Sequence, residues 1–425
     1  MTQQKLDRCH LRIGFVSTRF SGTDGVSLET AKWAAVLEEM GHCCFYLAGM
    51  SDRAADVSYV VPDLFFHTPE MDELHDIIFD NVVRPVGITQ KIHEYKESFK
   101  GHLYAFIRQF NIDLLIAENA LSIPVNIPLG MAITELVSET GIPTIGHHHD
   151  LYWERKRFLS NCAMEYIAMA FPPLIPGIKH VVINSVTASQ LSYRTGISSR
   201  VIPNVMDFDS PPRAGDDYAN SMRSDLGLGS EEKFILQPTR IIQRKGIEHA
   251  IELVSRMGIP AKLVISHAAG DEGREYEKRI RDYSRRMGVS TLFISDIIQQ
   301  TRKVLSDGRK VYTLEDAYPQ ADLITYPSEL EGFGNAFLEA VYFRRPIVVN
   351  RYSIYEIDIK PKGFEAIEFD GFITEDSIRR TRQVLLDGEA VQKMVEKNYA
   401  IARRYYSYSI LKRHLQSLIS ELFGE

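Results

Sequence analysis

Short apolar runs recur along the whole chain, and segments with helical spacing of apolar residues separate them. Runs typical of buried strands lie at residues 11–17, 43–48, 112–117, 142–145, 180–184, 233–237, 261–267, 291–294, 321–327 and 345–350. Helical patterns lie between them, at residues 31–39, 88–110, 247–257 and 272–287. This alternation predicts parallel sheets covered by helices, which is an α/β fold.

The alternation stops once, near the middle of the chain, and then restarts. Residues 210–217 (Ser-Pro-Pro-Arg-Ala-Gly-Asp-Asp) have the most linker-like composition of the sequence. A chain of 425 residues is also long for a single core. We therefore expect one domain at residues 1–208, a second at 209–404, and a C-terminal helical segment at 405–425.

Composition and charge indicate an ordinary globular enzyme, with 25% charged and 44% apolar residues. A net charge of −7 and a pI near 6.0 argue against sequence-independent binding to nucleic acid or to an anionic membrane. The first eight residues lack a signal-peptide core, and apolar runs stay shorter than about 18 residues, so we expect a cytoplasmic protein without a membrane span.

Four cysteines are present, and none has a paired metal-ligand spacing. Cys43 and Cys44 are adjacent in an apolar run, whereas Cys9 and Cys162 stand alone. We expect all four to be reduced, small core residues of a cytosolic protein.

A glycine turn late in the second half carries the strongest chemical signal. Residues 328–340 (Ser-Glu-Leu-Glu-Gly-Phe-Gly-Asn-Ala-Phe-Leu-Glu-Ala) follow a predicted strand and lead into a predicted helix with Asn335 as its N-cap. A helix N-terminus beside glycines suits a phosphate. The carboxylates of Glu331 and Glu339 suit hydroxyls, as on a sugar or a ribose. Together they favour a nucleotide sugar.

A second loop of the same half supplies positive charge. Arg240 and Lys245 lie between the predicted strand at 233–237 and the predicted helix at 247–257. Two cations on such a loop are well placed to neutralise a diphosphate. The alternative is an ordinary solvated loop, which is the more common fate of any single such residue.

Two weaker signals lie in the first half. The loop after the first strand carries Gly25, which is compatible with phosphate binding or with turn geometry alone. Asn119 follows the strand at 112–117, where open parallel sheets bind ligands. Its alternative is an asparagine that only satisfies turn geometry.

Three consecutive histidines follow the strand at 142–145, and His149 is succeeded by Asp150. Consecutive residues of an extended segment alternate faces, so the three cannot all converge on one ion, and no second ligand cluster is evident. We therefore expect a polar wall of an active site and no metal. Arg155 and Lys156 form either a solvated helix face or a cationic contact for an anionic substrate.

These motifs together resemble a known family. The segment 328–334, followed by Leu338-Glu339-Ala340 and Pro346-Ile347-Val348, resembles the Glu, seven residues, Glu signature of the family 4 retaining glycosyltransferases. The Gly25 loop, residues 202–207 and residues 239–246 occur in the family's order. The resemblance implies the GT-B architecture, with two Rossmann-like domains, an interdomain active-site cleft and a final helix that returns to the first domain.

The resemblance also implies roles for single residues. Arg240 and Lys245 would contact the donor diphosphate, Glu331 the transferred sugar and Glu339 the ribose, and Gly25 would bring backbone to the phosphate. Amides of Gly332, Phe333, Gly334 and Asn335 would hold sugar and phosphate, and His149 with Asp150 would face the sugar and acceptor. One departure is that Thr23-Asp24 separates Gly22 from Gly25, where many members have a double glycine.

The expected function is therefore that of a retaining glycosyltransferase which moves a hexose from a nucleotide-diphosphate sugar to a small hydroxyl acceptor. Arg155, Lys156 and Arg157 favour an anionic acceptor such as a glycerate-type molecule, and Asn119 is a further weak candidate for acceptor binding. We expect no metal and no cofactor besides the donor. The alternatives are a nucleotide-sugar epimerase and a nucleotide-sugar-binding regulator without turnover. The sequence leaves open the donor base and sugar, the acceptor, a transient covalent step and the oligomeric state, a homo-oligomer included.

Overall fold

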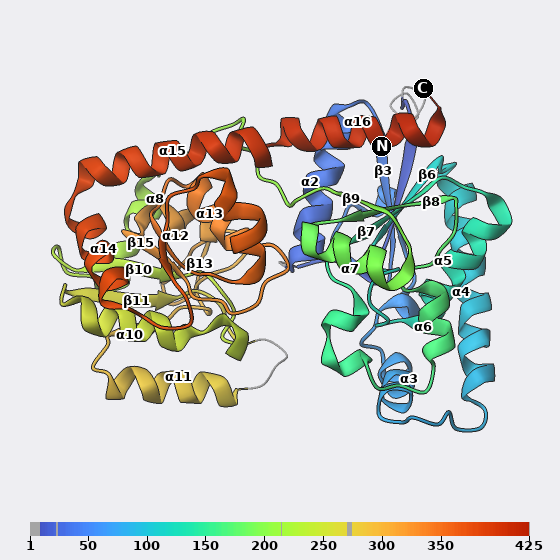
Figure 1. The fold of residues 1–425 in the computed structure, drawn as a ribbon, viewed down its shortest axis with the longest axis horizontal. Helices are drawn as coiled ribbons and strands as arrows, with labels where there is room; N and C mark the ends of the chain where they lie inside the picture. Colours follow the sequence, from blue (N-terminus) through green and yellow to red (C-terminus); the bar gives the residue numbers. More distant parts are fainter. Residues whose placement is uncertain (1–8, 23, 214, 270–273, 425) are drawn as a thin grey trace. The chain divides into compact units, whose positions relative to one another are not determined.

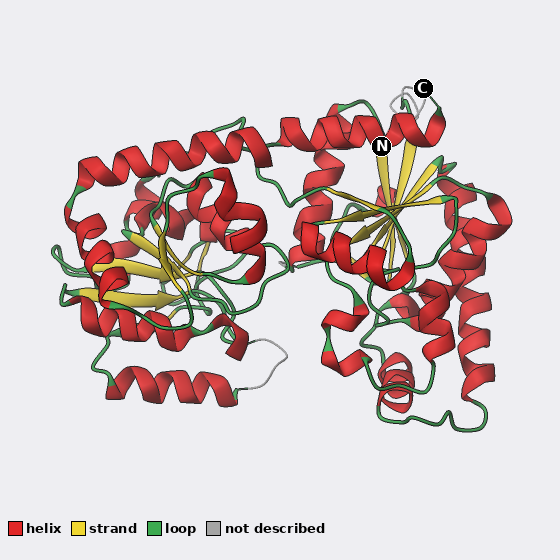
Figure 2. Cartoon of the chain, in the orientation of Figure 1, coloured by secondary structure: helices red, strands yellow, loops and turns green. Residues whose placement is uncertain are grey.

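The computed structural model describes residues 9–424, except residues 23, 214 and 270–273 (Figure 1). Contacts divide this part of the chain into two units, one ending at Asn204 and resuming at Tyr408, the other spanning Val205–Ser407. Each unit has its own parallel sheet with helices on both faces (Figure 2). The predicted α/β class with two Rossmann-like halves is confirmed. The segment 1–8, the linker residue Ala214 and the predicted helix start at Glu272 lie outside the described residues.

The first unit is built on a seven-stranded sheet of order β5-β3-β1-β6-β7-β8-β9, in which every neighbouring pair is parallel. Its strands are β1 (Arg12–Val16), β3 (Cys43–Ala48), β5 (Ser58–Val60), β6 (Leu114–Glu118), β7 (Thr144–His148), β8 (Ile178–Val182) and β9 (Ser199–Val201). A separate parallel pair is formed by β2 (Arg19–Phe20) and β4 (Met50–Ser51).

Seven α-helices are described for the first unit. They are α2 (Gly25–Glu39), α3 (Pro69–Phe79), α4 (Ile88–Phe110), α5 (Ile127–Thr140), α6 (Met164–Ala170), α7 (Ser185–Thr195) and α16 (Tyr408–Phe423). The predicted helix at residues 88–110 is confirmed as α4. It is flanked by Gly87 and Asn111, both in the left-handed conformation. Lys412 of α16 bonds to Glu39 of α2 at 2.8 Å. No helix among the described residues is long and apolar enough to cross a membrane.

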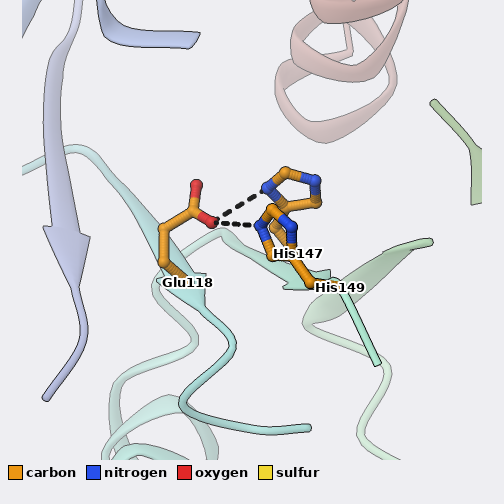
Figure 3. A group of neighbouring side chains, drawn as sticks. All are labelled: Glu118, His147 and His149. Atoms are coloured by element: carbon orange, nitrogen blue, oxygen red, sulfur yellow. Dashed lines mark hydrogen bonds and ion pairs between the residues drawn. The ribbon is translucent and has the colours of Figure 1, made fainter. Parts of the chain in front are cut away.

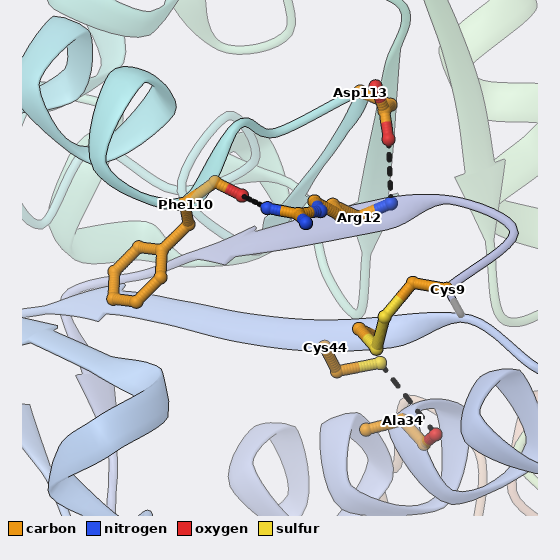
Figure 4. The surroundings of a disulfide bond; sticks show 7 residues. Cys9, Arg12, Ala34, Cys44, Phe110 and Asp113 are labelled. Atoms are coloured by element: carbon orange, nitrogen blue, oxygen red, sulfur yellow. Dashed lines mark hydrogen bonds between the residues drawn. A yellow bond between two sulfur atoms is a disulfide. The ribbon is translucent and has the colours of Figure 1, made fainter. Parts of the chain in front are cut away.

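The expectation of four reduced cysteines is wrong for one pair, because Cys9 and Cys43 form a disulfide (Figure 4). The parallel register of β1 with β3 sets Arg12 opposite Cys43, which brings the two cysteine Cα atoms to 5.6 Å. Their separation of 34 residues carries no signal of this pairing. Cys44 points the other way, toward the Ala34 carbonyl, and Cys44 and Cys162 are buried free thiols as expected.

The second unit has a six-stranded parallel sheet of order β12-β11-β10-β15-β16-β17. Its strands are β10 (Lys233–Gln237), β11 (Ala261–Ile265), β12 (Thr291–Phe293), β15 (Leu323–Tyr326), β16 (Ile347–Asn350) and β17 (Ile367–Phe369), with an antiparallel pair β13 (Lys303–Val304) and β14 (Lys310–Val311). Its helices are α8 (Asp217–Asn220), α9 (Met222–Asp225), α10 (Ile247–Met257), α11 (Glu275–Arg286), α12 (Leu314–Gln320), α13 (Asn335–Tyr342), α14 (Glu375–Leu386) and α15 (Gly388–Tyr406).

The strand order places the loops that carry the predicted chemistry. In the second unit the order reverses between β10 and β15, so the loops after these two strands leave the same sheet edge side by side. In the first unit the reversal lies between β1 and β6. Open parallel sheets bind ligands beyond the carboxyl ends of the strands at such reversals.

Candidate active site

A glycine allows the loop after β10 to pack closely against the loop after β15. Gly246 has a left-handed φ of +56°, and a Cβ there would lie 2.6 Å from the Pro327 carbonyl oxygen. A larger residue would therefore push the two loops apart. The amide of Glu329 also donates to the Arg244 carbonyl at 2.9 Å. This contact brings Lys245 beside Glu331, although 86 residues separate them.

Glu331 lies between two cations. Its Oε1 accepts from Lys245 Nζ, and its Oε2 accepts from Arg244 Nη1 at 3.2 Å. Only 10% of the Glu331 side chain and 11% of the Lys245 side chain are exposed, so the pair is largely shielded from water. Burial by itself would raise the pKa of Glu331, but Lys245 and Arg244 outweigh it and hold that pKa below its usual range. Burial lowers the pKa of Lys245.

Arg240 begins the same loop and is exposed. His267, just beyond β11, has a pKa of about 4, because it is buried and because Arg240 and Lys245 add positive charge beside it. The contribution of Arg240 and Lys245 to this shift shows that both cations act on the same place, which suits a diphosphate. Sequence reasoning missed Arg244 and His267. Arg244 could have been found because it is next to Lys245 in the sequence, and His267 because it lies at the end of a predicted strand.

The glycine turn before α13 differs from the prediction in one respect. Gly334, with φ +128°, is the N-cap, and Asn335 is the first helical residue, so the expected Asn335 cap is wrong. A Cβ at Gly334 would lie 2.2 Å from the Tyr352 hydroxyl oxygen, which donates to the Phe333 carbonyl at 2.9 Å. The Phe333 ring is buried against Tyr406. A ligand at this turn would therefore contact the backbone of Phe333 and not its side chain.

Glu339 lies on α13 and is half-buried. Its Oε2 accepts a hydrogen bond of 2.5 Å from the buried Tyr318 hydroxyl of α12. This bond fixes the direction in which the Glu339 carboxylate points. Sequence reasoning assigned no element or role to Tyr318.

In the first unit, two of the three consecutive histidines face the same carboxylate. His147 Nδ1 lies 2.9 Å and His149 Nε2 lies 3.4 Å from Oε2 of Glu118, the last residue of β6 (Figure 3). His148 faces the opposite side, with its Nε2 2.8 Å from His180 Nδ1. The objection that consecutive residues alternate faces therefore excludes His148 from a common site, but it does not exclude His147 and His149.

Burial and charge act on these groups in opposite directions. Burial by itself would lower the pKa of His149, but its bond to Glu118 outweighs burial and raises that pKa. The bond to Glu118 also acts to raise the pKa of His147, but burial outweighs it, and that pKa is lowered. Glu118, His147 and His149 are also residues that could hold a metal, because one ligand atom from each lies within 4.8 Å of the others. Glu118 was not predicted as a site residue, although it directly follows the predicted strand at 112–117.

The residues around Asp150 are tied to one another. Asn119 Oδ1 accepts from the His149 amide at 3.1 Å, and Asn119 Nδ2 donates to Asp150 Oδ1 at 3.1 Å. Arg155 Nε donates to the other oxygen of Asp150. Asn119, with a positive φ of 56°, thus braces the loop that follows β7. Lys156 is exposed in the short turn Lys156–Phe158.

Gly25 begins α2, and the preceding residue caps the helix. The carboxylate of Asp24 accepts from the amides of Val26 and Ser27 at 3.2 Å each, and from the Ser27 hydroxyl at 2.7 Å. An anion bound at these two amides would have to displace Asp24. The departure from a double glycine thus places a negative charge at the start of α2.

Two parallel-sheet units of this kind have the architecture of the GT-B fold. Residues 219–400 match the family model described as Glycosyl transferases group 1. The chain is 32% identical over 379 residues to the mannosylglucosylglycerate synthase of Petrotoga mobilis, covering 84% of this chain and 86% of the relative. The chain belongs to the glycosyl transferases group 1.

Two further comparisons extend over nearly the whole chain. The mannosylglucosylglycerate synthase of Thermotoga maritima is 29% identical over 435 residues, covering 95% of this chain and 98% of the relative. The solved structure of Anabaena Alr3699/HepE in complex with UDP and glucose shares the fold, with a TM-score of 0.64, 14% identity and coverage of 97% and 100%.

Proposed function

We propose that this protein is a retaining mannosyltransferase that moves a mannosyl group from a nucleotide-diphosphate sugar to glucosylglycerate. The reaction class is supported by the cluster of Lys245, Arg244 and Glu331 at the sheet reversal. The observation that carries the substrate class is the similarity, over nearly the full length, to two mannosylglucosylglycerate synthases. An acid acceptor also agrees with the glycerate-type molecule that the sequence favours.

The second unit holds the donor in this proposal. Arg240 and Lys245 bind the diphosphate, assisted by Arg244 and by the backbone from Gly332 to Asn335. The Glu331 carboxylate balances these cations in the structure, so an entering diphosphate competes with it for Lys245. Glu331 then accepts from a hydroxyl of the transferred sugar, and Glu339 accepts from the ribose.

The reaction breaks the bond between the anomeric carbon and the diphosphate oxygen. The departing diphosphate keeps the electron pair, and the acceptor hydroxyl oxygen bonds to the same face of the anomeric carbon. The acceptor proton passes to the leaving phosphate oxygen. Lys245 and Arg240 stabilise the charge that develops on the diphosphate, so no divalent ion is needed at that group.

The first unit supplies the remaining contacts in this proposal. His149 and Asp150 contact the sugar and the acceptor, and backbone at Gly25 approaches the donor phosphate. The acceptor carboxylate is bound by Lys156, which is exposed, and by Arg155 with Asn119. Arg155 already bonds to Asp150, so one acceptor can contact both residues.

A substrate panel tests the proposal. Mannosyl and glucosyl nucleotides with guanine, uracil or adenine bases are each combined with glucosylglycerate, with glycerate or with a neutral glucoside of equal size. Mass spectrometry is expected to show one added hexosyl group on glucosylglycerate from a mannosyl donor. Proton NMR of the product is expected to show that the new glycosidic bond keeps the anomeric configuration of the donor. An epimerised donor would favour the epimerase alternative, and binding without turnover would favour the regulator. The synthase relatives favour transfer.

A further inference from the structure

We propose that Glu118, His147 and His149 form a binding site for a divalent first-row transition metal ion, with Zn²⁺ as its representative. The three residues come from the ends of two neighbouring strands of the first unit (Figure 3). One of the three residues, His149, is also a proposed contact of the sugar and the acceptor, but metal binding is inferred and tested without the proposed reaction.

The backbone register brings the three ligands together. Glu118 of β6 is the parallel partner of His147 on β7, and His149 follows two residues later. Side chains two apart in an extended segment share a face, so both imidazoles reach the glutamate. A His-x-His pair beside a carboxylate from the next strand is thus a consequence of sheet geometry.

The spacing of the ligand atoms fits one ion. The Glu118 Oε2 atom lies 2.9 Å from His147 Nδ1 and 3.4 Å from His149 Nε2. Ligand bonds of about 2.0–2.2 Å at 90–110° place neighbouring ligand atoms about 3–3.5 Å apart. All three ligand atoms lie within 4.8 Å of one another. An ion could therefore replace the two hydrogen bonds with small side-chain movements.

Unpartnered polar atoms give a second, independent argument. Glu118 is fully buried, and its Oε1 has no hydrogen-bond partner. Within the described part of the chain, neither Lys nor Arg bonds to this carboxylate; its partners are the two imidazoles. Buried carboxylates in proteins are paired with a cation or coordinate a metal, because an unpaired charge is costly to bury. A divalent ion at this position would pair the buried carboxylate with positive charge.

The surroundings hold the ligands in place. The His147 ring stacks on Trp33 of α2, with 4.1 Å between ring centroids. Imidazole nitrogen with carboxylate oxygen suits Zn²⁺, Co²⁺ or Ni²⁺, whereas Mg²⁺ prefers oxygen ligands alone. A His149 ring that binds the ion through Nε2 keeps its Nδ1–H for a sugar hydroxyl, so the ion would also orient this residue.

Metal titration of protein that carries no polyhistidine tag tests the inference. After dialysis against a chelator, Co²⁺ is added and its visible absorption recorded, and Zn²⁺ is then added in competition. We expect one Co²⁺ per chain with a spectrum typical of nitrogen and oxygen ligands, displacement by Zn²⁺, and no competition from Mg²⁺. Elemental analysis after gel filtration is expected to give one Zn²⁺ per chain.

Variants locate the ion. Glu118→Gln and His147→Gln keep the side-chain shapes similar and are expected to weaken Zn²⁺ binding by at least about 100-fold. His67→Gln removes an exposed histidine that pairs with Asp72 and is expected to bind Zn²⁺ like the wild type. Circular dichroism reports whether each variant folds. The wild-type Co²⁺ spectrum decides the question even if the buried variants do not fold.

Two results would overturn the inference. Wild-type protein without stoichiometric Co²⁺ or Zn²⁺ would leave the cluster as an imidazole–carboxylate hydrogen-bond array. Equal affinity in folded Glu118→Gln protein would place the ion elsewhere. Neither result bears on the proposed reaction, because glycosyl transfer is measured separately. Zn²⁺ bound to protein that transfers no sugar would count against the proposed function alone.

Discussion

Replacing Lys245 with methionine tests the catalytic role proposed for the buried cation. Methionine keeps most of the apolar stem and removes the ammonium, which bonds to Glu331 and lies 5.5 Å from the centroid of the Tyr326 ring. In the proposed reaction this ammonium stabilises the leaving diphosphate. Loss of one preorganised group of this kind lowers kcat by about 10²–10³-fold. We expect a kcat at least about 100-fold lower.

The same change also lowers the free energy of unfolding, so the variant must be shown to stay folded before its kcat is interpreted. Removal of one partner of a fully buried pair costs about 3–5 kcal/mol. Arg244 still lies 3.2 Å from Glu331 Oε2, so the carboxylate keeps one cation. We therefore expect a loss of about 2 kcal/mol, the value of one charged hydrogen bond. For a unit of about 200 residues this lowers Tm by about 4–8 °C. The variant should stay folded at 25 °C.

The assay is steady-state kcat and KM for mannosyl transfer, with melting followed by circular dichroism. Lys262→Met is the matched control, because Lys262 is a largely buried lysine of the same unit that bonds to the Gly227 carbonyl and lies 3.6 Å from Glu232. We expect a similar fall in Tm and an unchanged kcat for this control. An unchanged kcat in folded Lys245→Met protein would refute the assignment.

Three further predictions concern groups that sequence reasoning missed or misplaced. Tyr318→Phe removes the hydroxyl that directs Glu339 and is expected to raise the donor KM about tenfold, equivalent to about 1.4 kcal/mol; a fall in kcat at unchanged KM would contradict the ribose role. His267 has a pKa of about 4 against an ordinary 6.5, so the unfolded chain takes up its proton first and stability is lost as pH falls from about 6.5 to 4. In urea titrations between these pH values, the free energy of unfolding of His267→Gln is expected to fall by about 2–3 kcal/mol less than that of the wild type. Equal falls for the two proteins would exclude His267 as the source. Gly334→Ala is expected to lose more than about 1 kcal/mol by calorimetry, since φ is +128° and Cβ would meet the Tyr352 hydroxyl; adding Tyr352→Phe should restore part, and no recovery would place the strain in φ alone.

Local patterns in the sequence determined the fold class and many element bounds. The helix at Ile88–Phe110 was predictable because its apolar spacing and its flanking Gly87 and Asn111 are local features. The glycine turn between Glu331 and Glu339 likewise lies in one continuous segment, so its position at a helix start could be predicted. The cap itself could not, because Gly334 is held by contact with Tyr352, which comes from another loop.

Tertiary structure decided which distant residues meet. The pairing of Lys245 with Glu331 depends on β10 lying next to β15, and the disulfide of Cys9 with Cys43 depends on the register of β1 with β3. The same holds for Glu118, which meets His147 only because β6 and β7 are in register. Strand order and register are set by packing of the whole sheet, whereas apolar periodicity is a property of neighbours along the chain. Sequence alone therefore named candidate cations and carboxylates, and the folded sheets assigned their partners.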